Sequence, residues 1–195
     1  MSKIIKINKG LDINLLGKAE AKVTALPMAD SYAVSPLDFE GVVPKLLVKV
    51  GEQVKAGDAL FFSKNDSRVL FTSPVSGTVT AVNRGEKRKV LNVTVQPDAT
   101  QSFKEFNIPA IEKTSKEDAT KLLLEAGLWP LIIQRPYGII ANPDDQPKAI
   151  FVSGFDSAPL AADSDVVLAN DKANLQKGFD VLARLTAGKV HLSLN

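Results

Sequence analysis

The chain has 195 residues, of which 45% are hydrophobic, and its 24 basic and 22 acidic residues leave a formal net charge of +2. This balance argues against a basic nucleic-acid surface and a polybasic membrane anchor. The absence of cysteine excludes disulfides, thiolate zinc sites, cysteine-ligated iron–sulfur clusters and a cysteine nucleophile from this chain.

The length and hydropathy suit one large domain or two small ones. No apolar run reaches the roughly 18 residues that a membrane span needs. The N-terminal apolar run is also too short for a secretion signal. We therefore expect a protein that is soluble or that reaches a membrane only through partners.

The first 35 residues predict strands around an irregular connection. Residues 3–8 alternate polar and apolar side chains and predict a first strand. Residues 19–26 are ambiguous between strand and helix. Pro27 and the polar residues after it favour an extended path, and residues 32–34 predict a second strand.

Residues 46–82 form the most distinctive stretch, because short apolar runs are separated by glycine turns. Gly51 and Gly57 mark these turns, apolar runs follow at 60–62 and 69–71, and Gly77 opens another strand at 77–79. Glycine permits the positive φ that tight turns between paired strands require. Residues 90–95 then predict a closing strand. The pattern is typical of a small β-barrel or sandwich.

This stretch resembles the barrel-sandwich domains that carry biotin or lipoate. The matching residues are Val48, Gly51, Val54, Gly57, Asp58, Leu60, Pro74, Gly77 and Val79. In that family a lysine at a hairpin tip is modified covalently, but here Asp66 occupies its place and Lys64 lies two residues away. We expect a structural β-domain without a swinging arm, and the carrier function remains the alternative.

A basic turn separates the two strands that end this β-region. It contains Arg84, Lys87 and Arg88, followed by Lys89, with Glu86 as the single acid. One interpretation is a solvated hairpin turn, which is common. The other is a docking patch for an acidic partner or an anionic ligand.

Residues 115–195 predict helices and strands in alternation. Thr114 or Ser115 with Glu117 or Asp118 predicts a capping box, followed by a helix that buries Ala119, Leu122, Leu123, Ala126 and Trp129. Residues 148–153 predict a buried strand of an α/β sheet. A helix from Asp171 with Leu175, Phe179, Leu182 and Leu185 on its inner side and a strand at 189–194 follow. Because the chain stops at a strand, we expect a longer polypeptide.

We therefore predict a mixed α+β chain: a β-rich region at 1–100 that contains the barrel sandwich at about 36–96, a linker at 101–114, and the start of an α/β, Rossmann-like domain at 115–195. Neither G-x-G-x-x-G nor G-x-x-x-x-G-K-[ST] occurs, so nucleotide binding by this chain has little support. The single histidine, His191, is expected to be buried or satisfied at a strand edge. Spacing supports no metal site and no catalytic residue.

The ordered motifs of the whole chain resemble the N-terminal part of the A subunit of the Na+-translocating NADH:quinone oxidoreductase. The motifs that carry the resemblance are K-G-L-D at 9–12, G-D-A-L-F at 57–61, F-T-S-P-V-S-G at 71–77, R-G-E-K-R at 84–88, R-P at 135–136, A-I-F-V at 149–152, P-L-A-A-D at 159–163, D-V-L at 180–182 and G-K-V-H-L at 188–192. The C subunit of a related electron-transport complex shares the F-T-S-P-x-S-G barrel but adds cysteine motifs, which this chain lacks.

The resemblance implies a peripheral subunit on the cytoplasmic side of the bacterial inner membrane. Its partners would be the other subunits of a complex that oxidises NADH, reduces ubiquinone or menaquinone and exports Na+. The resemblance places the flavins and the iron–sulfur centre in other subunits, so this chain would bind no cofactor and would not be catalytic alone. A contribution to a quinone pocket is a further expectation, with Trp129, Arg135 and Tyr137 as candidates, and ordinary core packing of this segment is the alternative. Arg84, Lys87 and Arg88 are candidates for docking.

Overall fold

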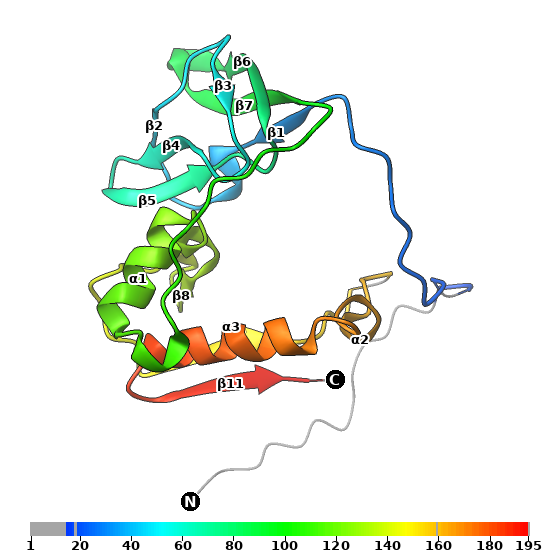
Figure 1. The fold of residues 1–195 in the computed structure, drawn as a ribbon, viewed down its shortest axis with the longest axis vertical. Helices are drawn as coiled ribbons and strands as arrows, with labels where there is room; N and C mark the ends of the chain where they lie inside the picture. The colour runs from blue at the N-terminus through cyan, green and yellow to red at the C-terminus, as the bar shows by residue number, and fades with distance from the viewer. Residues whose placement is uncertain (1–14, 18, 159, 195) are drawn as a thin grey trace, which may run out of the picture.

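The glycine-punctuated part of the chain folds into two small antiparallel sheets, seen at the top of the computed structural model, which describes residues 15–17, 19–158 and 160–194 (Figure 1). One sheet has the order β1-β7-β6-β3, with β1 Tyr32–Val34, β3 Gln53–Val54, β6 Gly77–Arg84 and β7 Val90–Pro97. The other has the order β2-β4-β5, with β2 Pro44–Leu46, β4 Ala59–Ser63 and β5 Asp66–Thr72. Short 3-10 turns, η1 Pro36–Asp38 and η2 Glu86–Arg88, complete this region.

The two sheets share one apolar core. Alternate residues of β5 and β6 point inward, and a register shift in β4 lets the adjacent Leu60 and Phe61 both be buried. Leu60, Phe61, Val79, Val93 and Val95 are fully buried. Phe61 stacks on Phe71 with ring centroids 4.7 Å apart. The predicted barrel-sandwich fold is thus confirmed, including the strands expected around 60–62, 69–71, 77–79 and 90–95.

A helix and a short hairpin join this β-region to the rest of the chain. The helix α1 Lys116–Glu125 begins at the predicted capping box, in which Ser115 and Asp118 satisfy each other's backbone N–H groups. Gly127, with φ of +70°, ends it, and a Cβ there would lie 2.5 Å from Thr72 Cγ2. The C-terminal end of α1 therefore rests on β5. The turns η3 Ile111–Lys113 and η4 Trp129–Leu131 and the hairpin of β8 Ile133–Gln134 and β9 Ile139–Ile140 flank the helix.

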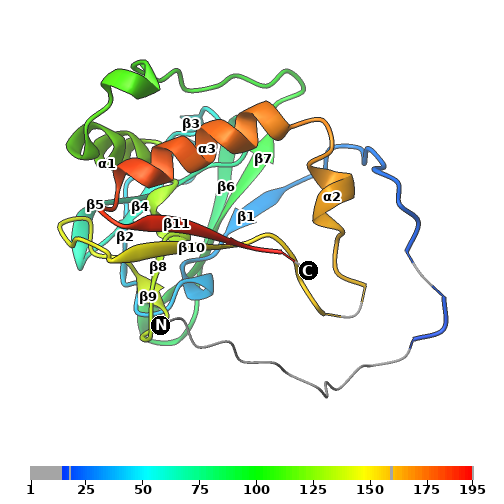
Figure 2. The ribbon, with the colours of Figure 1, turned by 90° about the horizontal axis from the view of Figure 1, so that it is seen from below.

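A parallel two-stranded sheet forms the lower part of the molecule. It pairs β10 Ala149–Ser153 with β11 Lys189–Ser193, and α2 Ser164–Val167 and α3 Lys172–Arg184 lie between them in the chain. Figure 2 shows α3 running alongside the two strands. This α/β arrangement has the fold class that was predicted for the second domain.

The prediction that residues 148–153 form a buried strand is wrong. Phe151 is 74% exposed and stacks on His191 with ring centroids 4.8 Å apart. His191 is itself exposed on β11, so of the two alternatives predicted for it the buried one is wrong and the position at a strand edge holds. The apolar run predicted the strand, but a strand is buried only where both faces of its sheet are covered. Here the two paired strands leave one face of the sheet open at Phe151.

Two other details differ from the sequence-based expectation. On α1 the buried positions are Ala119 and Leu124, whereas Leu122 and Leu123 are half-buried. Leu175 on α3 is exposed, Phe179 and Leu182 are half-buried, and only Leu185, the residue that follows α3, is buried. Residues 19–26 form neither helix nor strand, and the strand expected at 3–8 lies outside the described residues. Within the described ranges, no helix is long and apolar enough to cross a membrane.

Candidate functional site

The tip of the β4–β5 hairpin, where a carrier domain would present its lysine, is fastened to neighbouring backbone. The N–H of Lys64 donates to the carbonyl of Val43 at 2.8 Å, and the Asn65 side chain donates to the carbonyl of Gly41 at 3.1 Å. The side chain of Lys64 is exposed. The tip is therefore a supported turn, held by the segment that leads into β2.

Arg68 joins this hairpin to the loop that follows β9. Its Nε and Nη2 donate to the Asp66 carboxylate at 3.0 and 2.7 Å, and its Nη1 and Nη2 each donate to the Asp144 carboxylate at 2.8 Å. We call this arrangement the Arg68 bridge. A guanidinium that meets two carboxylates through paired N–H groups has the geometry in which arginine binds best. The bridge links residues 76 positions apart in the chain.

The bridge shifts the ionisation of all three side chains in the direction that keeps them charged. Hydrogen bonds from Arg68 lower the pKa of the Asp66 carboxyl and, in the same way, the pKa of the Asp144 carboxyl. Hydrogen bonds to Asp144 and then Asp66 raise the pKa of the Arg68 guanidinium. All three groups are therefore charged at neutral pH.

A cleft of about 710 Å³ lies beside the bridge, between the hairpin tip and β9. Its lining mixes charged side chains, Glu40, Lys64, Asp66, Arg68 and Asp144, with the apolar side chains Val42, Val69, Ile139 and Ile140. The cations and carboxylates in this lining largely neutralise one another, so the cleft offers no strong preference for one sign of ligand charge. Sequence patterns did not identify Arg68 or Asp144 as site residues, because neither lies in a local motif.

Asp144→Asn is expected to make folding stability less sensitive to acid. A carboxylate whose pKa is lower in the folded than in the unfolded chain contributes stability above its unfolded pKa of about 3.9, and the contribution is lost as the pH falls through the folded pKa. Urea unfolding at neutral pH and near pH 3 measures the change. Since Asp144 is well exposed, the effect is small. Asp145→Asn removes the neighbouring carboxylate and is the control; an equal loss of acid sensitivity in both variants would argue against the bridge.

The three quinone-pocket candidates differ in their burial. Trp129 is 5% exposed, and its Nε1–H donates to the carbonyl of Ala141 at 2.7 Å. Arg135 and Tyr137 lie in the exposed turn between β8 and β9. None of the three residues lines the cleft beside the Arg68 bridge. Their neighbours Leu128, Leu131 and Ile133 are exposed, so the segment presents apolar surface.

The docking candidates lie together on the β6–β7 turn. Arg84, Lys87 and Arg88 are all exposed, as is Lys89 beside them. The guanidinium of Arg84 donates from Nη1 to the carbonyl of Arg88 at 3.0 Å. The turn belongs to the barrel, whereas the quinone candidates belong to the segment after α1, so the two sets occupy different parts of the chain.

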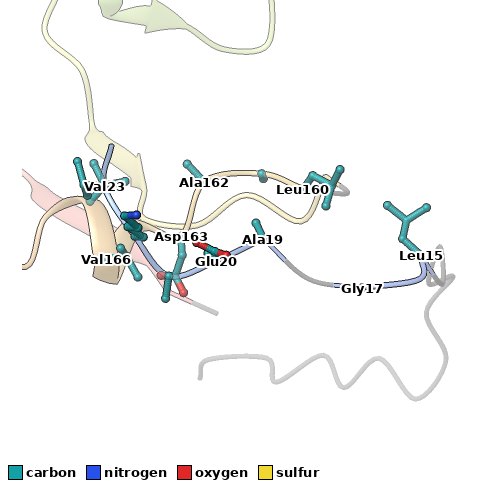
Figure 3. A pocket seen from close by; sticks show the side chains of 13 residues that line it. Leu15, Gly17, Ala19, Glu20, Val23, Leu160, Ala162, Asp163 and Val166 are labelled. Atoms are coloured by element: carbon teal, nitrogen blue, oxygen red, sulfur yellow. The ribbon is translucent and has the colours of Figure 1, made fainter. Parts of the chain in front are cut away.

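A second hollow, of about 670 Å³, lies between residues 15–17 and 19–23 on one side and residues 160–167 on the other (Figure 3). Ala19, Glu20 and Val23 line one side, and Ala162 and Asp163 line the other. Its lining is small and apolar with scattered charges. Within the described part of the chain, no group of three or more His, Asp or Glu side chains is arranged to hold a metal ion.

Two family models match the chain one after the other. The NqrA N-terminal barrel-sandwich hybrid domain matches residues 5–98, and the NqrA second alpha/beta domain matches residues 114–195. The two models describe the two kinds of sheet seen in the structure.

Curated relatives give the same result over nearly the whole chain. The A subunit of the Na(+)-translocating NADH-quinone reductase of Photorhabdus laumondii is 39% identical over 191 residues, which are 97% of this chain and 43% of that protein. The corresponding A subunits of Yersinia pestis and Saccharophagus degradans are 37% and 38% identical, over 97% and 96% of this chain and 43% and 42% of theirs. The chain thus spans less than half the length of these relatives.

Proposed function

The chain belongs to the NqrA family, and from this membership we propose that it acts as a non-redox part of a Na+-translocating NADH:quinone reductase. In this proposal the complex oxidises NADH, reduces quinone and exports Na+. The chain provides contact surface for the other subunits at the cytoplasmic side of the bacterial inner membrane. The observation that carries the proposal is the match to two NqrA domains in their order.

We further propose which subunits of the complex hold its redox cofactors. Flavins and the iron–sulfur centre belong to other subunits, and this chain binds neither. The chemistry of its side chains supports this division, since it has no cysteine to ligate a cluster. We also propose that the chain consists of a β-region at 1–100, a linker at 101–114 and an α/β part at 115–195.

Co-purification tests the assembly. When the chain is produced together with the membrane subunits of a relative's reductase, an affinity tag on the chain is expected to recover those subunits in equal amounts from detergent-solubilised membranes. A mixture in which the tagged chain elutes alone, while the membrane subunits assemble with their own A subunit, would contradict the proposal. The relative's own A subunit, tagged in the same way, is the positive control.

A quinone-facing role for residues 128–137 is the finer proposal. The support is the exposed apolar surface of Leu128, Leu131 and Tyr137 next to the cation Arg135, which could face a quinone's ring and its carbonyl oxygen. Titration of the chain with a soluble short-chain quinone, followed by Tyr and Trp fluorescence, tests it. A signal that does not saturate would remove the quinone role and leave the docking role intact.

The second candidate function is a biotin or lipoate carrier, which the barrel sandwich with an exposed Lys64 at its hairpin tip favours. Three observations weigh against it: Asp66 stands at the lysine's place, the tip is hydrogen-bonded to residues 41 and 43, and the Arg68 bridge ties the hairpin to the loop after β9. Co-expression with a biotin or a lipoate ligase, followed by intact mass measurement, is expected to return the unmodified mass. A mass increase by one biotinyl or lipoyl group would establish the carrier.

A further inference from the structure

The β6–β7 turn, residues 84–89, carries a local excess of positive charge. Four exposed cations, Arg84, Lys87, Arg88 and Lys89, accompany one acid, Glu86. Among the described residues, no carboxylate lies within ion-pair distance of any of these four cations. Arg68 and Lys121 do have such carboxylates. As far as the described residues show, the turn therefore keeps a net positive charge that Glu86 offsets only in part.

The backbone of this turn adopts a conformation that its residues do not favour. Lys87 has φ of 52° and ψ of 30°, Arg88 has φ of 60°, and the N–H of Lys89 donates to the carbonyl of Glu86 at 3.1 Å. Two successive residues with positive φ closed by such a bond are typical of a type I′ hairpin turn, for which Asn-Gly is the preferred pair. Long side chains at both positions are uncommon, because the Cβ atom crowds the backbone.

Two hydrogen bonds hold the turn in this conformation. The N–H of Gly85 donates to the carbonyl of Lys89 at 2.8 Å, and Arg84 donates to the carbonyl of Arg88 at 3.0 Å. Residues in sparsely populated backbone regions persist where the surrounding structure over-determines them, and they concentrate at binding sites. Lys87 and Arg88 thus sit where hairpin stability alone would favour other residues, and both are cations.

We propose that residues 84–89 are the surface on which an acidic protein segment of a partner subunit docks. The inference rests on the proposed function, since it names the chemistry of one contact within that assembly. Arginine and lysine donors bind carboxylates through charge-assisted hydrogen bonds, and complementary charge sets both the rate and the orientation of docking.

The composition of the turn favours a protein over a membrane surface. Polybasic lipid-binding segments contain 4–8 cations placed next to a membrane-spanning helix or along an amphipathic one. This turn has four cations with an acid among them, on a short β-hairpin. Among the described residues, the guanidinium of Arg84 makes one hydrogen bond, from Nη1 to the carbonyl of Arg88. Its remaining N–H groups can therefore bind a carboxylate through two parallel hydrogen bonds.

One double variant separates a docking role from a purely structural one. Lys87→Asn with Arg88→Gly restores the preferred type I′ pair and removes two positive charges. It is expected to raise Tm by roughly 2–4 °C, as relief of strain at two turn residues would in a chain of this size. The same variant is expected to weaken binding to an acidic peptide about tenfold at low salt. A turn with no docking role would show the higher Tm and unchanged binding.

The binding measurement uses a fluorescein-labelled peptide of alternating Glu and Asp, read by anisotropy with the intact chain. The matched control is Lys172→Asn with Lys177→Asn, which removes two exposed charges from α3 and is expected to leave the affinity unchanged. A Gln and Asn version of the peptide is expected not to bind. Equal weakening in both double variants would show a response to net charge alone and would overturn the proposal.

Vesicles test the other source of negative charge. The chain is expected not to sediment with vesicles that contain one third phosphatidylglycerol. Sedimentation that the Lys87→Asn and Arg88→Gly variant abolishes, without binding to the acidic peptide, would overturn the protein partner in favour of a membrane surface. If the chain fails to co-purify with the membrane subunits but binds the peptide through this turn, the proposed assembly fails while the acidic-segment site stands.

Discussion

Replacing Gly77 by alanine is expected to destabilise the chain by about 3 kcal/mol or more, which is the upper end of what overpacking costs. A Cβ at this position would lie 1.9 Å from the carbonyl oxygen of Gln96 and 2.9 Å from Cα of Pro97. Both atoms belong to the backbone of β7, which pairs with β6 at this point. No side-chain rotation can relieve the contact, so the strands must separate locally.

Urea unfolding measures this effect, and α3 provides a matched control. Gly178 is exposed on that helix, and a Cβ there would have nothing within 4 Å. Gly178→Ala is therefore expected to stabilise the chain by about 0.5–1 kcal/mol, the difference in helix propensity between the two residues. The two Gly→Ala changes should thus differ in sign. A Gly77→Ala variant as stable as the wild type would contradict the close strand packing.

Trp129→Ala is expected to destabilise the chain by about 3–5 kcal/mol, as truncation of a buried aromatic side chain does. Trp129 is 5% exposed and belongs to the same apolar cluster as Phe71 on β5 and Leu124 on α1. Its truncation would leave a cavity where the β-region meets the elements after it. Since Trp129 was also a quinone-pocket candidate, its variants must be examined for folding before ligand binding is compared.

Trp129→Phe separates packing from hydrogen bonding at this position. It keeps a ring in the cluster but removes the donor to the carbonyl of Ala141, so it is expected to cost about 1–3 kcal/mol. If the folded Trp129→Phe variant binds a quinone as the wild type does, Trp129 acts only in the core. If the free energy of unfolding measured with urea is the same for Trp129→Ala and the wild type, the apolar cluster around Trp129 does not stabilise the packing of the β-region against α1.

Local patterns predicted the elements well where the determining contacts are short in sequence. The capping box of Ser115 and Asp118 and the strands of the barrel all depend on residues a few positions apart. The same reasoning was insufficient for burial. Leu124 is buried on α1 although the expected stripe ran through Leu122 and Leu123, because the helix rests on β5 through its C-terminal end.

The candidate sites show the same difference between features that local sequence predicts and features that depend on tertiary contacts. Exposure of the basic turn at 84–89 could be expected from its composition, but the positive φ of Lys87 and Arg88 could not, because nothing in Lys-Arg favours that conformation. The Arg68 bridge had no sequence signal, since its partner Asp144 is 76 residues away. Family membership, in contrast, follows from ordered motifs along the chain and requires no structure.

Periodicity, capping residues and glycine turns act over a few residues, so the barrel strands, the helix α1 and the family can all be predicted from the amino-acid sequence. Which apolar faces are covered and which charges meet depends on contacts between distant segments of the folded chain. Phe151 remains open on a strand whose apolar run predicts burial, and Arg68 finds Asp144 across the junction. Burial and ion pairing depend on which surfaces the folded chain brings together, and the packing of segments that are distant in the sequence decides this.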